Sequence, residues 1–83
     1  MRGKIVLINA RSGIFAVQLE DGDFAVLELS GSYDIEFNDV IKGELDNLGP
    51  MEIWNVTKRE EISVFGQSGR CSVESARQLI YGP

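Results

Sequence analysis

The sequence contains no histidine and only one cysteine, Cys71. Histidine is the most common general base at neutral pH and the most common metal ligand, so the usual routes to both kinds of chemistry are missing. A single thiol can form neither an internal disulfide nor a zinc site built from several cysteines. We therefore expect a protein that is not an enzyme and has no metal site and no cofactor, with Cys71 reduced and partly packed.

Long apolar runs and catalytic or nucleotide-binding motifs are also absent. Residues 5–8 are apolar, but four such residues are too few for a membrane span or for the core of a signal peptide. The sequence has no glycine-rich phosphate loop and no paired nucleophile motif. Its 83 residues are 43% hydrophobic and 25% charged, which is typical of one small globular domain. We expect a cytoplasmic protein that does not enter a membrane.

Cations are scarce in this sequence. Eight Lys and Arg residues face thirteen Asp and Glu residues, and the net charge is −5. Residues 12–57 carry ten of the acidic residues and a single cation, Lys42. This acidic middle opposes nucleic-acid binding, because such binding draws much of its affinity from neutralised phosphates. If a polyanion binds at all, the candidate phosphate contacts are Arg2, Lys4, Lys58 and Arg59.

Short apolar segments alternate with turn signals along residues 1–70, which is typical of β structure. An Asp-Gly pair at Asp21 and Gly22 separates two of them and is a strong hairpin signal. The carboxylates of Glu20, Asp21 and Asp23 crowd this turn but lack the spacing of a calcium loop, so we interpret them as a solvated hairpin tip. The predicted strands are residues 4–9, 14–19, 24–29, 40–45 and 52–57, followed by a short strand at 61–66.

The apolar period changes after Cys71. Ser72 is a typical N-cap residue for a helix. The apolar residues that follow it have helical spacing: Val73, Ala76, Leu79 and Ile80. The pattern predicts a short amphipathic helix at residues 72–80. A helix of this length is marginal alone in water, so we expect its apolar face to pack on the rest of the domain.

A three-stranded meander, followed by a long connection and two further strands, is typical of the OB-fold. We therefore predict an all-β fold: a five-stranded Greek-key OB-fold barrel with a short C-terminal α-helix. Residues 1–57 form the barrel in this prediction. Residues 58–83 form a C-terminal extension packed on the barrel, with a short strand at 61–66 and the helix at 72–80.

Three segments of the predicted barrel resemble the cold-shock domain family. Residues 3–13, Gly-Lys-Ile-Val-Leu-Ile-Asn-Ala-Arg-Ser-Gly, resemble the family's opening, which is roughly G-x-V-K-W-F-N-x-x-K-G. Residues 23–28 stand where the family has V-F-V-H-F, and residues 49–56 resemble its closing G-P-x-A-x-N-V with one extra residue. The resemblance covers about residues 2–57. It depends mainly on turn and bulge residues, which relate to the fold more than to the ligand.

The resemblance implies a face on the first three strands that binds single-stranded nucleic acid. At the family's ligand-binding positions, this sequence has aliphatic or acidic residues in place of aromatic and basic ones. A base stacked on an aromatic ring contributes about 1–3 kcal/mol, so the loss of these rings predicts weak binding of single-stranded DNA or RNA. An aliphatic face needs a cover, and we expect the predicted helix to supply it, either within one chain or across a homodimer. The residues at these positions are Leu7, Ile8, Ile14, Ala16, Ala25, Leu27 and Glu28.

Two classes of function stay open at this point. The first is a small non-catalytic binding module for protein-protein interaction or self-association, which uses apolar patches or an edge strand to bind an unknown protein partner or to form a homodimer. The second is weak single-stranded nucleic-acid binding, like that of the cold-shock family. The large aromatic residues do not decide between them. Trp54 and Phe65 have two interpretations, exposed stacking residues or residues in the core or against a strand end, and we expect the second.

Overall fold

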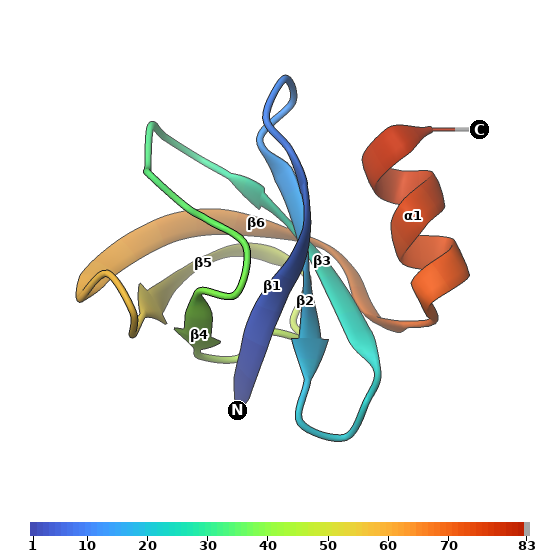
Figure 1. The fold of residues 1–83 in the computed structure, drawn as a ribbon, viewed down its shortest axis with the longest axis horizontal. Coiled ribbons are helices and arrows are strands. Elements are labelled where there is room, and N and C mark those ends of the chain that lie inside the picture. Colours follow the sequence, from blue (N-terminus) through green and yellow to red (C-terminus); the bar gives the residue numbers. More distant parts are fainter. Residues whose placement is uncertain (83) are drawn as a thin grey trace.

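The computed structural model describes residues 1–82, and the strands among them close into one barrel with a helix on its outside (Figure 1). The order around the barrel is β1-β2-β3-β6-β5-β4, and β4 pairs with β1 to close it. The elements are β1 (Arg2–Asn9), β2 (Ile14–Leu19), β3 (Phe24–Leu29), β4 (Val40–Lys42), β5 (Gly49–Asn55), β6 (Glu60–Cys71) and α1 (Val73–Tyr81). The prediction of a β-barrel with a short C-terminal helix is confirmed.

β1, β2 and β3 form the predicted antiparallel meander. The bounds of β2 and β3 agree with the prediction, and β1 begins at Arg2, before the predicted start. The β2–β3 turn contains Gly22 at φ 95°, a backbone conformation that favours glycine. A bulge between Ile5 and Leu7 shifts the register of β1 against β2, and such bulges bend a strand. β1 pairs with β4 only before this bulge, through residues 2–4.

The second half of the barrel differs from the prediction. β4 stops at Lys42 instead of residue 45, because Gly43 at φ 153° turns the chain away. β6 runs to Cys71 instead of ending near residue 66, and it pairs with β5 on one side and β3 on the other. The barrel therefore has six strands rather than the predicted five. A strand from residues 58–83, the region predicted as an extension, takes part in the barrel itself.

Gly66 explains why β6 continues through a stretch that looks like a turn in the sequence. A Cβ atom at this position would collide with the backbone carbonyl oxygen of Asn47, so only glycine fits there. Residues 67–69 then bulge against β3. Ser68 fills the gap that the bulge leaves, because its hydroxyl accepts a hydrogen bond from the Val26 N–H at 3.0 Å.

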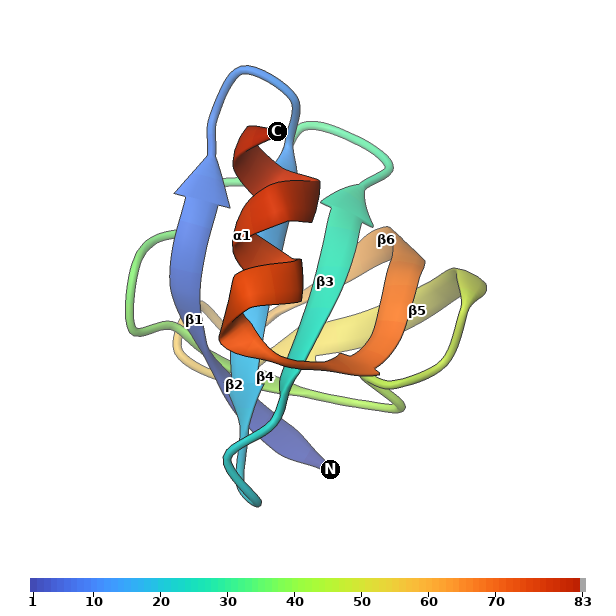
Figure 2. The ribbon, with the colours of Figure 1, turned by 90° about the vertical axis from the view of Figure 1, so that its right-hand side faces the viewer.

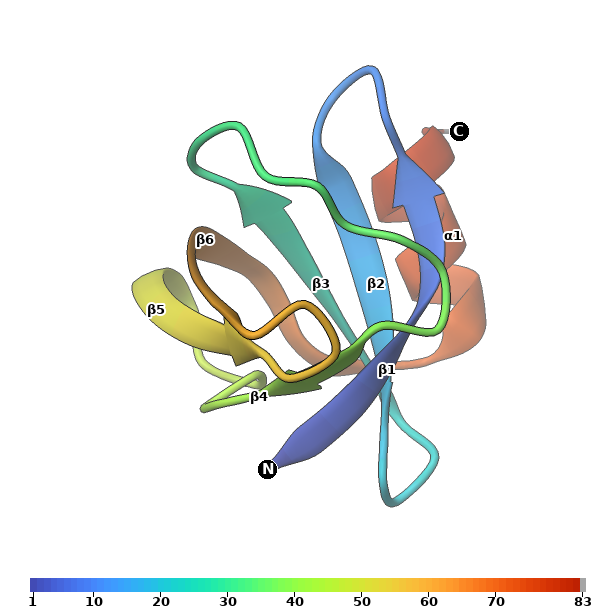
Figure 3. The ribbon, with the colours of Figure 1, turned by 60° about the vertical axis from the view of Figure 1, so that its left-hand side comes forward.

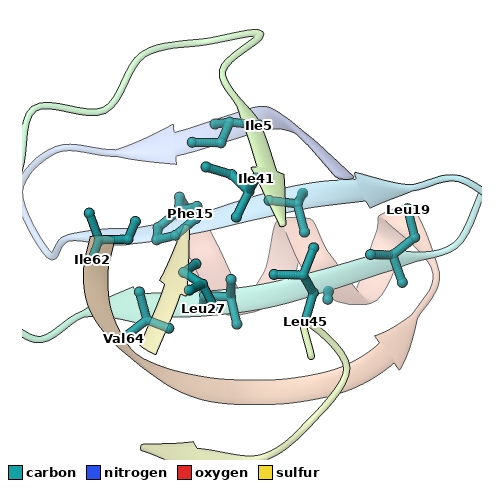
Figure 4. Close-up of a cluster of buried hydrophobic side chains, with 11 residues drawn as sticks. Ile5, Phe15, Leu19, Leu27, Ile41, Leu45, Ile62 and Val64 are labelled. Atoms are coloured by element: carbon teal, nitrogen blue, oxygen red, sulfur yellow. The ribbon is translucent and has the colours of Figure 1, made fainter. Parts of the chain in front are cut away.

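One cluster of apolar side chains fills the barrel interior. Figure 4 shows Ile5, Phe15 and Leu27 pointing into this interior from β1, β2 and β3, with Ile62 and Val64 of β6 beside them. Full burial of a large apolar side chain contributes about 1.5–3 kcal/mol. The cluster comprises Ile5, Phe15, Val17, Leu19, Ala25, Leu27, Ile41, Leu45, Ile53, Ile62 and Val64.

α1 begins after Ser72 and ends at Tyr81, within one residue of the predicted helix. The Ser72 hydroxyl accepts a hydrogen bond from the Ser75 N–H at 3.2 Å, which satisfies one of the free donors of the first turn. Gly82 ends the helix at φ 79°, and its N–H donates to the Gln78 carbonyl oxygen at 2.8 Å. No helix within residues 1–82 has the length and apolar character needed to cross a membrane.

Candidate functional site

α1 covers the outer face of the β1–β2–β3 meander. Figure 2 shows the helix in front of β2, with β1 on one side and β3 on the other. Ala76 and Ile80 of the helix are buried against Ala16 and Val26 of the sheet. At the end of the helix, the Asn9 side-chain amide donates a hydrogen bond to the Ile80 carbonyl oxygen at 2.8 Å. The helix of the same chain therefore covers this outer face.

The residues at the cold-shock ligand positions do not form one surface. Side chains alternate between the two faces of a strand, so neighbouring positions point in opposite directions. Those that pack beneath or beside α1 are Leu7, Ile14 and Ala16. Those that belong to the barrel interior or pack against it are Ile8, Ala25 and Leu27. Glu28 lies near the end of β3, opposite Phe65 of β6.

Lys58, one of the four candidate phosphate contacts, is engaged with carboxylates of its own chain. Its Nζ lies 3.0 Å from Glu36 Oε1 and 3.4 Å from Asp39 Oδ2. The hydrogen bond to Glu36 raises the pKa of Lys58. Lys58 is therefore not free to bind a phosphate. The other three candidates are exposed: Arg2 and Lys4 on β1, and Arg59 in the β5–β6 turn.

Asp39 and Asn55 form a buried polar pair in the same network. The Asn55 side-chain amide and the Glu36 N–H both donate to Asp39 Oδ2, each at 3.0 Å. Burial alone raises the pKa of Asp39, but these hydrogen bonds and the charge of Lys58 lower it below the ordinary value of 3.8. These hydrogen bonds join the long connection before β4 to the end of β5, so Asp39 and Asn55 have a structural role.

Arg70 of β6 is paired with the acidic residues at the tip of the β2–β3 hairpin. It forms ion pairs with Asp21 and Asp23, and its Nε donates to Asp46 Oδ2 at 3.2 Å. The Asp23 N–H donates to Asp21 Oδ1 at 3.1 Å, and this hydrogen bond, together with the Arg70 charge, lowers the pKa of Asp21. No group of three or more Cys, Asp or Glu residues within residues 1–82 is arranged to hold a metal ion. The cluster ties the β2–β3 hairpin to β6 and to the β4–β5 connection.

A shallow hollow of about 600 Å³ is open to solvent between the β1–β2 turn and the connection after β3. It is lined by residues 10–13, Leu29 and residues 31–34. Ligand pockets usually enclose most of the ligand and place a few polar groups inside. Arg11 and Asp34, the charged residues of this hollow, are exposed, so it is a poor candidate for a small-molecule site.

The side of the barrel away from α1 carries exposed aromatic rings. Figure 3 shows β5 and β6 on this side. Trp54 on β5 is 43% exposed, and Phe65 on β6 is 45% exposed. The expectation that they lie in the core is wrong, because Ile53, Ile62 and Val64 take the inward positions and their neighbours point outward. The sequence signal for this orientation is the alternation of residues 51–53 and 61–64, which places Trp54 and Phe65 on the outward side when the period is continued by one residue.

The outward residues of β5 and β6 are arranged in three cross-strand pairs. Successive pairs are two residues apart along the strands, which is about 7 Å. The first and last pairs hold the aromatic rings, and the middle pair holds a carboxylate. The pairs are Pro50–Phe65, Glu52–Ser63 and Trp54–Glu61, and we call this surface the β5–β6 face.

The β5–β6 face is mainly acidic, and Lys42 of β4 lies beside Trp54 at one border. Glu28 at the end of β3 borders the first pair. Glu52 accepts a hydrogen bond from the Ser63 hydroxyl at 2.7 Å, and Glu28 accepts one from the Gln67 side-chain amide at 3.2 Å. Both donors are neutral. Among residues 1–82, neither these two carboxylates nor Glu61 forms an ion pair with a lysine or arginine.

Comparison with protein-family models, curated proteins and solved structures gave no match for this chain. Its function must therefore be inferred from its own residues. Of the residues predicted as a ligand face, Leu7, Ile14 and Ala16 pack beneath or beside α1. The β5–β6 face combines two exposed rings with carboxylates that no cation neutralises within the described residues, and it is the candidate site.

Proposed function

We propose that this chain is a small non-catalytic binding module that docks another protein on its β5–β6 face. The observation that carries the proposal is the exposure of Trp54 and Phe65 on a sheet face that α1 leaves free. Aromatic residues are enriched at protein interfaces, and an exposed apolar patch with a polar rim is typical of an interaction site. Every strand of the closed barrel has a neighbour on each side, although β4 contacts β1 and β5 through only a few residue pairs, so we favour the aromatic face over addition of an edge strand.

We also propose that the barrel is a divergent OB-fold related to the cold-shock domain. The glycines at positions 3, 13 and 49 support this relation, and so does the meander followed by a long connection. Relative to a five-stranded barrel, the short β4 is then an addition between β1 and β5. Because α1 covers the outer face of the meander, a shared fold does not carry a shared ligand site.

Single-stranded nucleic acid is the second candidate ligand. Arg2 and Lys42 are exposed and lie opposite each other on β1 and β4, and this pair of like charges favours an anionic ligand on that side. The aromatic rings that would stack bases, however, lie next to Glu52 and Glu61. These carboxylates repel phosphates, so the β5–β6 face favours a protein.

A second copy of this chain is a less suitable partner than a different protein. Each copy has a net charge of −5 and presents the same unpaired carboxylates on the β5–β6 face. A symmetric contact through this face would bring like charges together, which opposes association. We therefore propose a monomer that binds a different protein.

The test places a photoreactive phenylalanine analogue at Phe65 and, as a matched control, at Tyr81, an aromatic residue of α1 that is 58% exposed. In the cells that naturally make the chain, we expect a discrete adduct with another protein from position 65 and none from position 81. The purified partner should then bind the unmodified chain, and Phe65→Ser should weaken that binding about tenfold or more.

Three outcomes contradict the proposal. The first is an equal yield of adducts from both positions, and the second is an adduct with nucleic acid alone. The third is sedimentation that shows a concentration-dependent dimer while position 65 crosslinks only to a second copy of the chain. In each case the exposed rings would serve something other than a different protein.

A further inference from the structure

We infer that the partner binds through an extended cationic segment, in which lysine or arginine side chains alternate with apolar ones. This inference rests on the proposed function of the β5–β6 face and adds the chemistry of what binds there. It is carried by the charge of the face, by the order of its groups and by the spacing of its cross-strand pairs.

The charge of the face favours a positive partner, because three carboxylates outnumber the one cation, Lys42 of β4, that lies beside Trp54. Glu52 and Glu61 lie within it, and Glu28 borders it from β3. The donors that reach these groups, Ser63 and Gln67, are neutral and leave the negative charge in place. Asp21, Asp23 and Glu36 are similarly exposed, but each is paired with Arg70 or Lys58. Complementary charge across an interface steers association and selects the partner.

The order of groups along the face places a carboxylate between two rings. Phe65 lies in the first cross-strand pair, Glu52 in the middle pair and Trp54 in the last. An interface usually anchors on a few aromatic residues, while charged groups at its rim select the partner. The matching partner therefore presents an apolar group at each end and a cation between them. A lysine or arginine there can also lie over a ring and gain a cation–π contact.

The spacing of the pairs matches an extended peptide. Successive pairs are about 7 Å apart, and side chains on one face of an extended segment repeat at the same distance. A segment that runs along the strands would place side chain i on Phe65, side chain i+2 on Glu52 and side chain i+4 on Trp54. The predicted pattern is apolar, cationic, apolar at every second residue.

The probe for this inference is a synthetic nine-residue peptide with serine at every even position and leucine, lysine, leucine, lysine, leucine at the odd ones. The comparison peptide has glutamate in place of lysine. Trp54 is the only tryptophan of the sequence, so its emission reports binding at this face directly. Amide shifts in NMR spectra locate the contact. We expect the lysine peptide to shift β5 and β6 signals and Trp54 emission, and the glutamate peptide to leave both unchanged.

Charge-removing variants test the carboxylates. Glu52→Gln combined with Glu61→Gln should weaken binding of the lysine peptide about three- to tenfold and reduce its dependence on salt. The matched control combines Glu20→Gln with Glu74→Gln, which removes the same net charge from exposed residues of the β2–β3 hairpin and α1. We expect the control to bind as the unmodified chain does.

The outcomes separate this inference from the proposed function. The inference of a cationic segment is overturned if both peptides bind equally, or if the two double variants bind the lysine peptide equally well. A loss of binding in Phe65→Ser would still support the β5–β6 face as a docking site. If Phe65→Ser binds as tightly as the unmodified chain, or if the shifts map to another surface, the proposed function of the face fails as well. If neither peptide perturbs β5 or β6 at millimolar concentration, the inference is overturned, and the crosslinking experiment alone decides the proposed function.

Discussion

Replacing Ile80 by alanine tests whether its buried apolar face holds α1 on the barrel. Ile80 is 3% exposed and packs with Ala16 and Val26 of the sheet. The substitution removes the side chain beyond Cβ, and at about 0.8 kcal/mol per buried methylene the loss is about 2.4 kcal/mol. Alanine has a higher helix propensity than isoleucine, which offsets this loss by a few tenths of a kcal/mol. We expect the free energy of unfolding to fall by about 2 kcal/mol.

Thermal unfolding followed by circular dichroism measures this loss. In a domain of this size each kcal/mol lowers Tm by about 4–8 °C, so we expect Tm to fall by about 8–16 °C. Gln78→Ala is the matched control, because Gln78 is exposed on the same helix, and we expect a change below about 0.5 kcal/mol. Equal Tm values for the two variants would refute the reasoning, because they would show that burial of Ile80 does not stabilise the fold.

Cys71 gives an independent readout of the same variant. It is the only cysteine of the sequence, and it packs against the cluster between α1 and the sheet. Undocking of the helix exposes the thiol, and about 2 kcal/mol corresponds to about 30-fold faster labelling by a thiol reagent when undocking limits the reaction. If Tm falls while the labelling rate stays unchanged, Ile80 stabilises the chain without holding the helix in place.

The remaining predictions concern a buried carboxylate and a glycine. Because the folded chain lowers the pKa of Asp39, its stabilising contribution is complete above the ordinary value of 3.8 and is lost as the pH falls through the folded pKa. The urea midpoint should therefore fall on acidification below about pH 4, and Asp39→Asn should lower the midpoint at neutral pH and reduce this acid dependence. Gly66→Ala should cost about 3 kcal/mol or more in urea unfolding, because its Cβ meets the Asn47 carbonyl, whereas Gly31→Ala, next to a side-chain ring, should cost less than about 1 kcal/mol. Equal midpoints for the two glycine variants would contradict this account.

Local signals are sufficient for the elements whose shape depends on neighbours in the chain. The Asp-Gly turn and the apolar segments around it locate β2 and β3 at their observed bounds. Ser72 and the helical spacing after it locate α1 within one residue. The hydrogen bonds of a tight turn and of a helix cap join residues a few positions apart, so a short stretch of sequence contains both partners.

Local signals do not predict the orientation of the aromatic residues in the candidate site. Trp54 and Phe65 are large and aromatic, and averages over residue type place them in the core. Their orientation follows from the alternation within β5 and β6, which requires both strands to be located first. The ion pair between Arg70 and Asp21 joins residues 49 positions apart, and nothing near either residue indicates the other.

The amino-acid sequence determines a small acidic β protein with a C-terminal amphipathic helix, because apolar period, turn residues and caps act over a few positions. Only the tertiary structure decides that the barrel has six strands, that α1 covers the β1–β2–β3 meander of its own chain and that the β5–β6 face stays open. Each of these depends on contacts between distant segments. One such contact joins Asn47 and Gly66. The carbonyl oxygen of Asn47 occupies the place where a Cβ atom of residue 66 would lie, so only glycine fits there.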